Sequence, residues 1–162
     1  MSLQIGRPAP DFVLRDQHGQ QVSLAAFRGV KAVAVMFYPF AFSRVCTGEL
    51  QAVRDSLPTF ESGDVQLIAV SCDPMFSLRA FAEQESLTFP LLSDFWPHGE
   101  VARAYGAFDD ERGCADRSSF VVDRSGVLRW AVHNESPQAR DLEEQARVLA
   151  RTAAQTQAQA QA

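Results

Sequence analysis

Two short apolar runs limit what this 162-residue chain can fold into. Residues 32–38, AVAVMFY, and residues 65–72, VQLIAVSC, are rich in aliphatic residues and carry no charge. Runs of this length and composition are typical of strands buried inside a sheet. Between them, apolar positions in residues 43–61 recur at close to helical spacing, with Ser43 as a suitable N-cap. The alternation predicts an α/β fold in which helices cover both faces of a sheet.

The remaining segments continue this alternation. Residues 11–16 and 21–24 flank the turn signal HGQ and predict a small N-terminal hairpin. We expect one domain over residues 1–154, because a chain of this length has room for a single core. Residues 155–162 are low-complexity Ala and Gln without an apolar stripe and are predicted to be a disordered tail. Other strands are expected at residues 89–94, 118–123 and 127–133, and other helices at residues 76–84, within 95–106 and at 136–154.

The composition argues against two classes of partner. Acidic and basic residues are mixed along the chain and give a formal net charge of -5, so no basic stripe is available for a nucleic acid. The longest apolar runs are shorter than the roughly 20 residues that a membrane span needs. The first residues, MSLQIGRPAPDF, have neither a cationic start nor an apolar signal core. We therefore expect a cytoplasmic protein without nucleic-acid or membrane partners.

The cysteines do not fit the common roles of paired thiols. The chain has three, Cys46, Cys72 and Cys114, and no C-x-x-C pair. An odd number at wide spacing does not form a secretory disulfide framework, a zinc knuckle or the dithiol of an ordinary thioredoxin-type oxidoreductase. The histidines are also scattered, so we expect no metal site and no bound cofactor.

Cys46 lies where a thiolate would be stabilised. If the helix begins near Ser43, Cys46 is in its first turn, where backbone N–H groups are unpaired and the helix dipole is positive. Such surroundings favour the thiolate, which is the nucleophilic form of cysteine. Pro39 cannot continue a sheet ladder and helps the chain to leave the strand at residues 32–38. A buried structural cysteine is the competing interpretation, and position alone leaves both open.

The residues around Cys46 carry a resemblance to a known family. Pro39, Ser43 and Cys46 in YPFAFSRVC fit the pattern P-x-x-x-[T/S]-x-x-C, which resembles the signature of the peroxiredoxins. The resemblance covers nearly all of the chain except the tail, and LLSDFWPHGEVARAYGAF is most similar to the one-cysteine branch called alkyl hydroperoxide reductase E. Further similar segments are GRPAPDFVLRDQHGQ, CTGEL, FPLLSDFWPHG and RSSFVVDRSG.

The resemblance implies a fold, an activity and an assembly. The implied fold is thioredoxin-like, with a central mixed β-sheet flanked by helices and an N-terminal β-hairpin. The implied activity is that of a thiol-dependent peroxidase, which reduces hydrogen peroxide, organic hydroperoxides and peroxynitrite through a cysteine sulfenic acid. A homodimer is implied as well.

The resemblance also implies a role for each site residue. Cys46 is the peroxidatic nucleophile that attacks the distal peroxide oxygen. The hydroxyl of Ser43, where the family more often has threonine, orients the peroxide and the thiolate. Arg117 supplies a cation that stabilises the thiolate and the charge that moves onto the peroxide. Pro39 shields the thiolate from water, and Glu49 anchors the arginine as a supporting partner.

Several of these roles have plain structural alternatives. Ser43 can serve as an N-cap alone, and Arg117 can be a solvated arginine at a strand edge, with Arg44 as a competing cation much nearer to Cys46 in sequence. Glu49 taken alone is an ordinary exposed helix residue. The aromatic residues of the segment FWPHG either fill the core or lie at a dimer contact beside the active site, and exposure would favour the contact.

The reduction of oxidised Cys46 is the step that the sequence determines least. Some peroxiredoxins carry a resolving cysteine five residues after the peroxidatic one, but that position is Gln51, and the C-terminal tail has no cysteine. Cys72 is more easily explained as a structural thiol, while Cys114 is open between bystander and resolver. Without a resolving cysteine, an external thiol must reduce the sulfenic acid. The resemblance implies mycothiol or another small thiol, or a mycoredoxin, glutaredoxin or thioredoxin-like protein.

Two other functions would use these features differently. A peroxide-sensing redox switch or thiol-dependent binding module needs the same thiolate but no efficient turnover, and a scaffold needs no thiolate. The set of Pro39, Ser43, Cys46 and Arg117 favours the enzyme, because a scaffold has no use for a hydroxyl and a cation around one thiol.

Overall fold

The computed structural model describes residues 3–134 and 139–161. Within this part of the chain, no helix is long and apolar enough to cross a membrane. The elements in chain order are β1 (Val13–Arg15), β2 (Gln21–Ser23), the 3-10 helix η1 (Ala25–Phe27), β3 (Ala32–Phe37), α1 (Arg44–Asp55), α2 (Leu57–Phe60), β4 (Val65–Ser71), α3 (Met75–Glu85), β5 (Leu91–Ser93), α4 (Glu100–Ala104), β6 (Phe108–Asp109), β7 (Cys114–Ala115), β8 (Arg117–Val122), β9 (Leu128–Asn134) and α5 (Leu142–Gln161).

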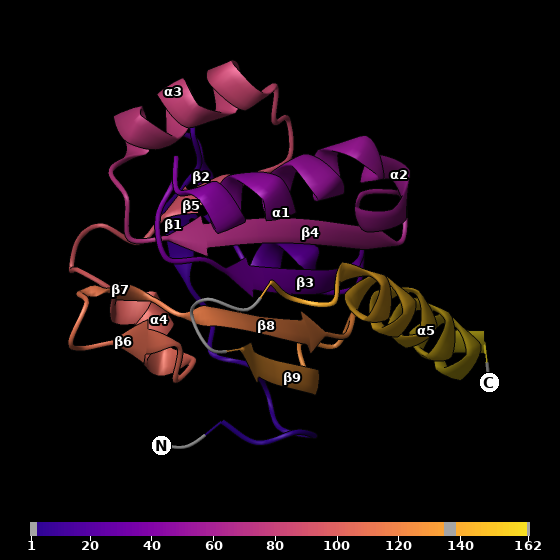
Figure 1. Cartoon of the computed structure of the whole chain (residues 1–162). Coiled ribbons are helices and arrows are strands. Elements are labelled where there is room, and N and C mark those ends of the chain that lie inside the picture. Colours follow the sequence, from indigo (N-terminus) through magenta and orange to yellow (C-terminus); the bar gives the residue numbers. More distant parts are fainter. Residues whose placement is uncertain (1–2, 135–138, 162) are drawn as a thin grey trace.

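A 7-stranded mixed sheet forms the centre of the protein, with strand order β2-β1-β5-β4-β3-β8-β9 (Figure 1). Strand β4 is parallel to both β3 and β5, whereas β8 runs antiparallel to β3 and to β9. Met36 of β3 lies opposite Ala69 of β4 and Ser119 of β8. The predicted N-terminal hairpin is present, with Val13 of β1 opposite Ser23 of β2. The predicted α/β fold with a central mixed sheet is therefore confirmed.

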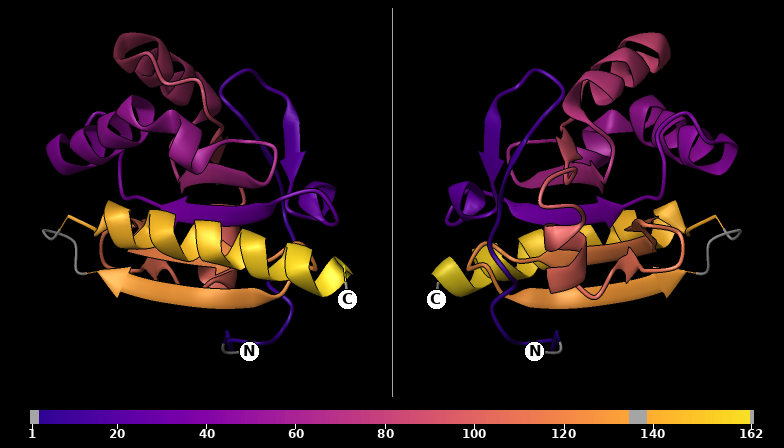
Figure 2. Two further views of the ribbon diagram at one scale, coloured as in Figure 1. Left: turned by 90° about the vertical axis from the view of Figure 1, so that its right-hand side faces the viewer. Right: turned by 90° about the vertical axis from the view of Figure 1, so that its left-hand side faces the viewer.

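Side chains alternate along β3 and divide the core into two layers. Ala34 and Met36 are buried in the layer that also contains side chains of α1, α3 and α5. Val35 and Phe37 are buried in the opposite layer, with side chains of α4 and of the N-terminal segment. Figure 2 shows the long helix α5 lying against one side of the sheet. Because both faces are covered, β3 and β4 are buried along their whole length, which explains their almost continuous apolar sequences.

The helix predicted over residues 43–61 is in fact two helices. Its start is as predicted, with Ser43 at the N-cap position, but α1 ends at Asp55 and α2 begins at Leu57. Pro58 explains the break, because proline has no backbone N–H and its ring clashes with the carbonyl four residues earlier. Proline is tolerated in the first turn of a new helix, where that N–H would have no partner.

Two other segments differ from the sequence prediction. Residues 108–115, where no strand was predicted, form a short hairpin of β6 and β7 in which Phe108 lies opposite Ala115. Strands this short leave no readable hydrophobic period. The terminal helix begins at Leu142, and its backbone continues to Gln161, beyond the expected domain end. Residues 135–138 lie outside the described residues, and the boundary at residue 154 stays a prediction.

Candidate active site

Cys46 sits in the first turn of α1, just beyond the end of the central strand. Strand β3 ends at Phe37, the chain leaves the sheet through the buried Pro39, and α1 begins after Ser43. The Cys46 side chain is fully buried among apolar residues of the α1 layer. The helix N-terminus therefore points its unpaired N–H groups and the positive end of its dipole toward the region of the sulfur.

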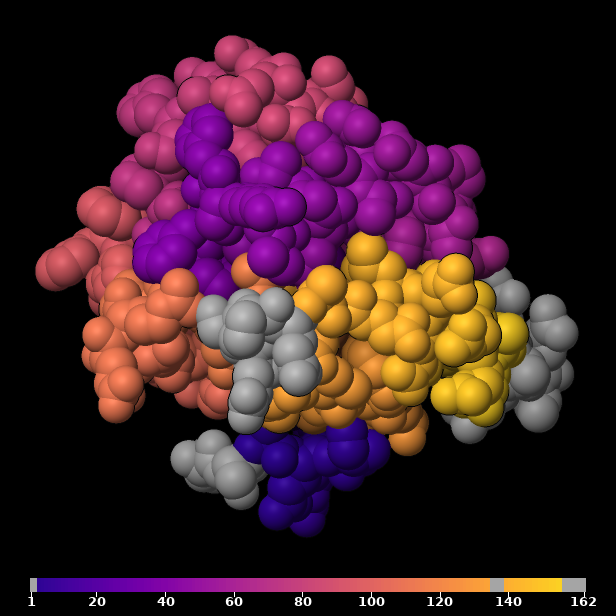
Figure 3. Space-filling view, in the orientation of Figure 1, coloured from indigo at the N-terminus to yellow at the C-terminus, as the bar shows by residue number. Residues whose placement is uncertain are grey.

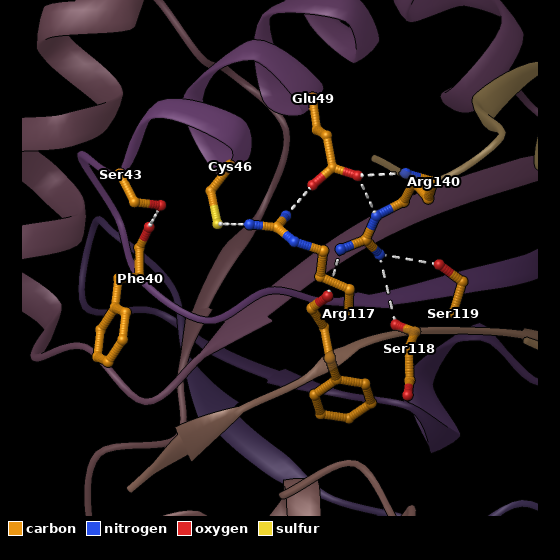
Figure 4. Close-up of polar contacts among 9 residues, drawn as sticks. Phe40, Ser43, Cys46, Glu49, Arg117, Ser118, Ser119 and Arg140 are labelled. Atoms are coloured by element: carbon orange, nitrogen blue, oxygen red, sulfur yellow. Dashed lines mark hydrogen bonds and ion pairs between the residues drawn. The ribbon is translucent and has the colours of Figure 1, made fainter. Parts of the chain in front are cut away.

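Arg117 brings a cation to Cys46 from a distant part of the chain. Its Nη2 donates a hydrogen bond to Sγ of Cys46 at 3.2 Å, and the arginine is itself only 4% exposed (Figure 4). The register explains the contact: Met36 pairs with Ser119, so the first residue of β8 lies just past the end of β3. Arg44, the competing cation, is exposed on α1.

Glu49 is buried and lies between two arginines. One carboxylate oxygen accepts a hydrogen bond from Nη1 of Arg117, and the other accepts one from Nε of Arg140 at 2.6 Å. The glutamate is 5% exposed. Glu49 and Cys46 are three residues apart on one helix face, so both reach the same arginine. The structure therefore brings Cys46, Arg117 and Glu49 together.

Arg140 is a member of the site that sequence reasoning missed. Its main-chain N–H also donates to Glu49 at 3.0 Å, its Nη2 donates to the carbonyl of Phe37 at 2.6 Å, and its Nη1 donates to Oγ of Ser119 at 2.9 Å (Figure 4). Burial lowers the pKa of Arg140, and the charge of Glu49 opposes that shift. The sequence carries no signal for this role, because Arg140 lies in an irregular segment far from Cys46.

The buried charges of the cluster balance when Cys46 is ionised. A thiolate and the Glu49 carboxylate carry two negative charges, and Arg117 and Arg140 carry two positive ones. Buried charges are tolerated when they are paired and hydrogen-bonded, as all four groups are here. The cluster can therefore hold a thiolate away from bulk water without leaving a charge unpaired.

Ser43 occupies the predicted position, but its hydroxyl has a different partner from an N-cap. Oγ donates to the carbonyl of Phe40 at 2.8 Å, and no side-chain cap bond to the helix is formed. This bond uses the proton and leaves the lone pairs of the hydroxyl oxygen as acceptors. Ser43 is thus held at the entrance of α1, beside the loop that precedes it.

The other two cysteines are buried free thiols. Cys72 follows β4 and Cys114 begins β7. Burial, reinforced by the charge of Asp94, raises the pKa of the Cys72 thiol to about 12. Burial also raises the pKa of Cys114, against the opposing effect of Arg112. Both thiols are therefore protonated near neutral pH.

The described side chains include no group of three or more His, Cys, Asp or Glu residues that could hold a metal ion. Nor do they form a disulfide, since all three cysteines are free. What the site offers chemically is a single buried sulfur with a fixed cation, a nearby hydroxyl and a carboxylate that holds the cation in place. Nucleophilic attack by that sulfur is the chemistry that this arrangement favours.

The chain is similar to known proteins over most of its length. Residues 5–131 match the AhpC/TSA family. The chain is 49% identical over 139 residues to alkyl hydroperoxide reductase E of Mycobacterium tuberculosis, covering 86% of this chain and 91% of that protein. It is 35% identical over 159 residues to a peroxiredoxin of Schizosaccharomyces pombe, covering 92% of this chain and 81% of that protein.

Solved structures extend the similarity to three dimensions. The crystal structure of AhpC from Enterococcus faecalis superposes with a TM-score of 0.84 at 30% sequence identity, covering 98% of this chain and 96% of that chain. Peroxidoxin BcpB from Mycobacterium tuberculosis gives a TM-score of 0.79 at 28% identity, covering 92% of this chain and 97% of that chain. Sequence, fold and site thus agree: the chain belongs to the AhpC/TSA family of peroxiredoxins, the thiol-dependent peroxidases of the thioredoxin-like fold.

Proposed function

We propose that Cys46 is the peroxidatic nucleophile of this thiol-dependent peroxidase. The observation that carries the proposal is the hydrogen bond of 3.2 Å from Arg117 Nη2 to Cys46 Sγ inside a closed cluster of buried charges. A buried structural thiol has no use for such a cation, whereas a nucleophile that reacts as a thiolate does.

The chemistry requires one bond to form and one to break. The Cys46 thiolate attacks the distal oxygen of the hydroperoxide ROOH, the S–O bond forms, the O–O bond breaks, and RO⁻ leaves and takes up a proton. The products are a cysteine sulfenic acid and the alcohol ROH. Arg117 stabilises the thiolate before attack and the negative charge on the departing oxygen during it. The hydroxyl oxygen of Ser43 orients the incoming peroxide, and Pro39 helps to keep water away from the sulfur.

The substrates that we propose are hydrogen peroxide, organic hydroperoxides and peroxynitrite. The relative named alkyl hydroperoxide reductase E, at 49% identity, supports the organic hydroperoxides. A peroxide-sensing role would use the same thiolate without efficient turnover, and membership of a peroxidase family disfavours it. A cytoplasmic location stays a prediction.

Replacing the nucleophile tests the proposal directly. Cys46→Ser removes the sulfur and changes little volume, so we expect peroxide reduction to be lost while the protein stays folded. Stopped-flow mixing with hydrogen peroxide and with an organic hydroperoxide measures the reaction, and circular dichroism checks the fold. Fast peroxide reduction by the folded Cys46→Ser protein would rule out Cys46 as the nucleophile.

The two candidate cations can be separated by matched substitutions. We expect Arg117→Met to slow peroxide reduction by about a hundredfold or more, because a charge fixed in a buried site acts on the transition state. Arg44→Met should slow it by less than about threefold, since solvent and salt screen an exposed charge. Second-order rate constants from the same stopped-flow assay decide the matter. An equal or larger loss from Arg44→Met would mean that Arg117 is the wrong arginine.

We further propose that an external thiol, rather than a second cysteine of this chain, reduces the sulfenic acid. The raised pKa values of Cys72 and Cys114 leave few thiolates to attack it. Mycothiol or another small thiol, or a mycoredoxin, glutaredoxin or thioredoxin-like protein, would then complete the cycle.

The one-cysteine cycle makes a prediction for mass spectrometry. After one equivalent of peroxide, the wild type and the variants Cys72→Ser and Cys114→Ser should all carry a trappable sulfenic acid at Cys46 in similar yield. Excess peroxide should convert it to the sulfinic acid in all three proteins. Stoichiometric formation of a Cys46 to Cys114 disulfide in the wild type would instead make Cys114 the resolving cysteine.

We also propose a homodimer that covers an exposed apolar face. Trp96 is 82% exposed, Phe76 is 70% exposed and Phe95 is 47% exposed, and the three side chains line one hollow of about 480 Å³ together with Val13. Large exposed aromatic side chains gathered in one place are typical of an interface. The FWPHG segment, which contains Phe95 and Trp96, therefore lies on the surface instead of filling the core.

A charged residue in this face should weaken the dimer. We expect Trp96→Glu to raise the dissociation constant of the dimer by about tenfold or more, because a central aromatic residue often dominates an interface. Val30→Glu is the matched control: Val30 is 51% exposed but does not line this hollow, and its change should leave association unaltered. Sedimentation at a series of concentrations measures both. A wild-type protein that stays monomeric at high concentration would refute the dimer.

A further inference from the structure

We propose that Asp73 is a positioning residue that fixes the active-site loop, residues 39–43, ahead of Cys46. Asp73 follows β4, and its Oδ2 accepts a hydrogen bond from the backbone N–H of Ala41 at 2.8 Å. Within the described part of the chain, the hydrogen bond of Asp73 to this region goes to the loop backbone and not to the sulfur, so Asp73 would act through the loop. The inference rests on the proposed role of Cys46 and adds a residue that the sequence pattern does not indicate.

The loop needs an external support because its backbone is strained. Phe42 has a φ of 69°, in the left-handed region that residues with a Cβ rarely adopt. Such a conformation persists only where neighbouring groups hold it in place. Phe42 directly precedes Ser43, the residue at the N-cap of α1, so relaxation of Phe42 would move both Ser43 and the helix turn that carries Cys46.

Three successive loop residues are each held by a different part of the chain. The ring of Phe40 lies 5.6 Å from the guanidinium carbon of Arg112, in the turn between β6 and β7. Ala41 donates to Asp73, and the ring of Phe42 packs against Phe81 of α3 with centroids 5.0 Å apart. In Figure 3 the orange surface of the β6–β7 segment adjoins the purple surface of the segment that contains this loop.

Asp73 is the support best suited to set the position of the loop. A charged carboxylate gives a stronger and more directional bond than the two ring contacts. Asp73 is also fixed at its own main chain, where its N–H donates to Ser71 Oγ at 3.3 Å and its carbonyl accepts from Ser93 Oγ at 2.7 Å. The bond to Ala41 therefore ties the loop to the ends of β4 and β5, on the same sheet that carries Arg117.

The consequence concerns the geometry between the sulfur and its cation. Arg117 is placed by β8 and the charge cluster, whereas Ser43 and the first turn of α1 are placed by the loop. Without the bond from Asp73, Ser43 and the first turn of α1 can shift relative to Arg117. Peroxide attack needs both sets of groups correctly placed around the peroxide, because a displacement of about 1 Å can slow a reaction by about a hundredfold.

Three substitutions test whether the acceptor atom or the charge of Asp73 matters. Asp73→Asn keeps an acceptor oxygen in place without the charge, and we expect a rate constant for peroxide reduction within about threefold of the wild type. Asp73→Glu keeps the charge but displaces the acceptor by one methylene, and Asp73→Ala removes it; we expect both to be slower by about tenfold or more. If Asp73 instead acted through its charge, Asp73→Asn would be the slow variant and Asp73→Glu would react at close to the wild-type rate.

A second readout separates positioning from loss of the fold. Alkylation of Cys46 by iodoacetamide needs the thiolate but not an aligned peroxide, so we expect Asp73→Glu and Asp73→Ala to slow alkylation by less than about threefold, a much smaller loss than that of peroxide reduction. Asp16→Ala is the matched control, because Asp16 also accepts loop N–H groups, from His18 and Gln20, but does so in the β1–β2 turn and not in the active-site loop. Its peroxide rate should equal that of the wild type.

The outcomes distinguish this inference from the proposed function. If Cys46→Ser is inactive while Asp73→Glu and Asp73→Ala react at the wild-type rate, the positioning role of Asp73 is wrong and the function of Cys46 stands. Equal slowing by Asp73→Asn and Asp73→Glu, or a parallel loss of alkylation, would also overturn it. If Cys46→Ser still reduces peroxide, the proposed function itself fails.

Discussion

The buried pairing of Glu49 with Arg117 and Arg140 is the constraint on which the active site depends. The three side chains are 5%, 4% and 6% exposed, so none of them can rely on water to offset its charge. Removing one partner from a buried ion pair typically costs about 3–5 kcal/mol, because the remaining charge is left unpaired. Since the three residues come from α1, from β8 and from the segment before α5, their pairing fixes those parts of the chain relative to one another.

The central sheet fixes the position of the cluster formed by Glu49, Arg117 and Arg140. Strand β3 ends at Phe37, whose carbonyl accepts from Arg140, and β8 supplies both Arg117 and the Ser119 hydroxyl that Arg140 also contacts. The end of β3 is also where the chain turns into α1 and places Cys46. One end of the sheet therefore brings together Cys46, the arginine that contacts its sulfur and the residues that hold this arginine.

The three buried thiols of this protein differ in their polar partners. Cys72 and Cys114 are buried without an adequate cationic partner, and burial raises the pKa of each. Cys46 is equally buried but has a guanidinium at 3.2 Å. Among these three thiols, the long-range contact with Arg117 distinguishes Cys46, and it is the basis for the proposal that Cys46 alone reacts with peroxide.

The sequence by itself determined the class of fold and the family, and it named the candidate residues of the site. Periodicity predicts β3, β4 and α1, because buried strands and amphipathic helices leave local patterns. The spacing of Pro39, Ser43 and Cys46 indicates the family, because this motif lies within one turn and the start of one helix.

Only the tertiary structure decided the contacts between distant segments. It selects Arg117 over Arg44, buries Glu49, and adds Arg140 and Asp73, because these contacts depend on strand register and on loop approaches between segments far apart in the chain. Local sequence patterns do not encode such distances: the family resemblance pointed to Arg117 and Glu49, whereas Arg140 and Asp73 left no signal in the sequence.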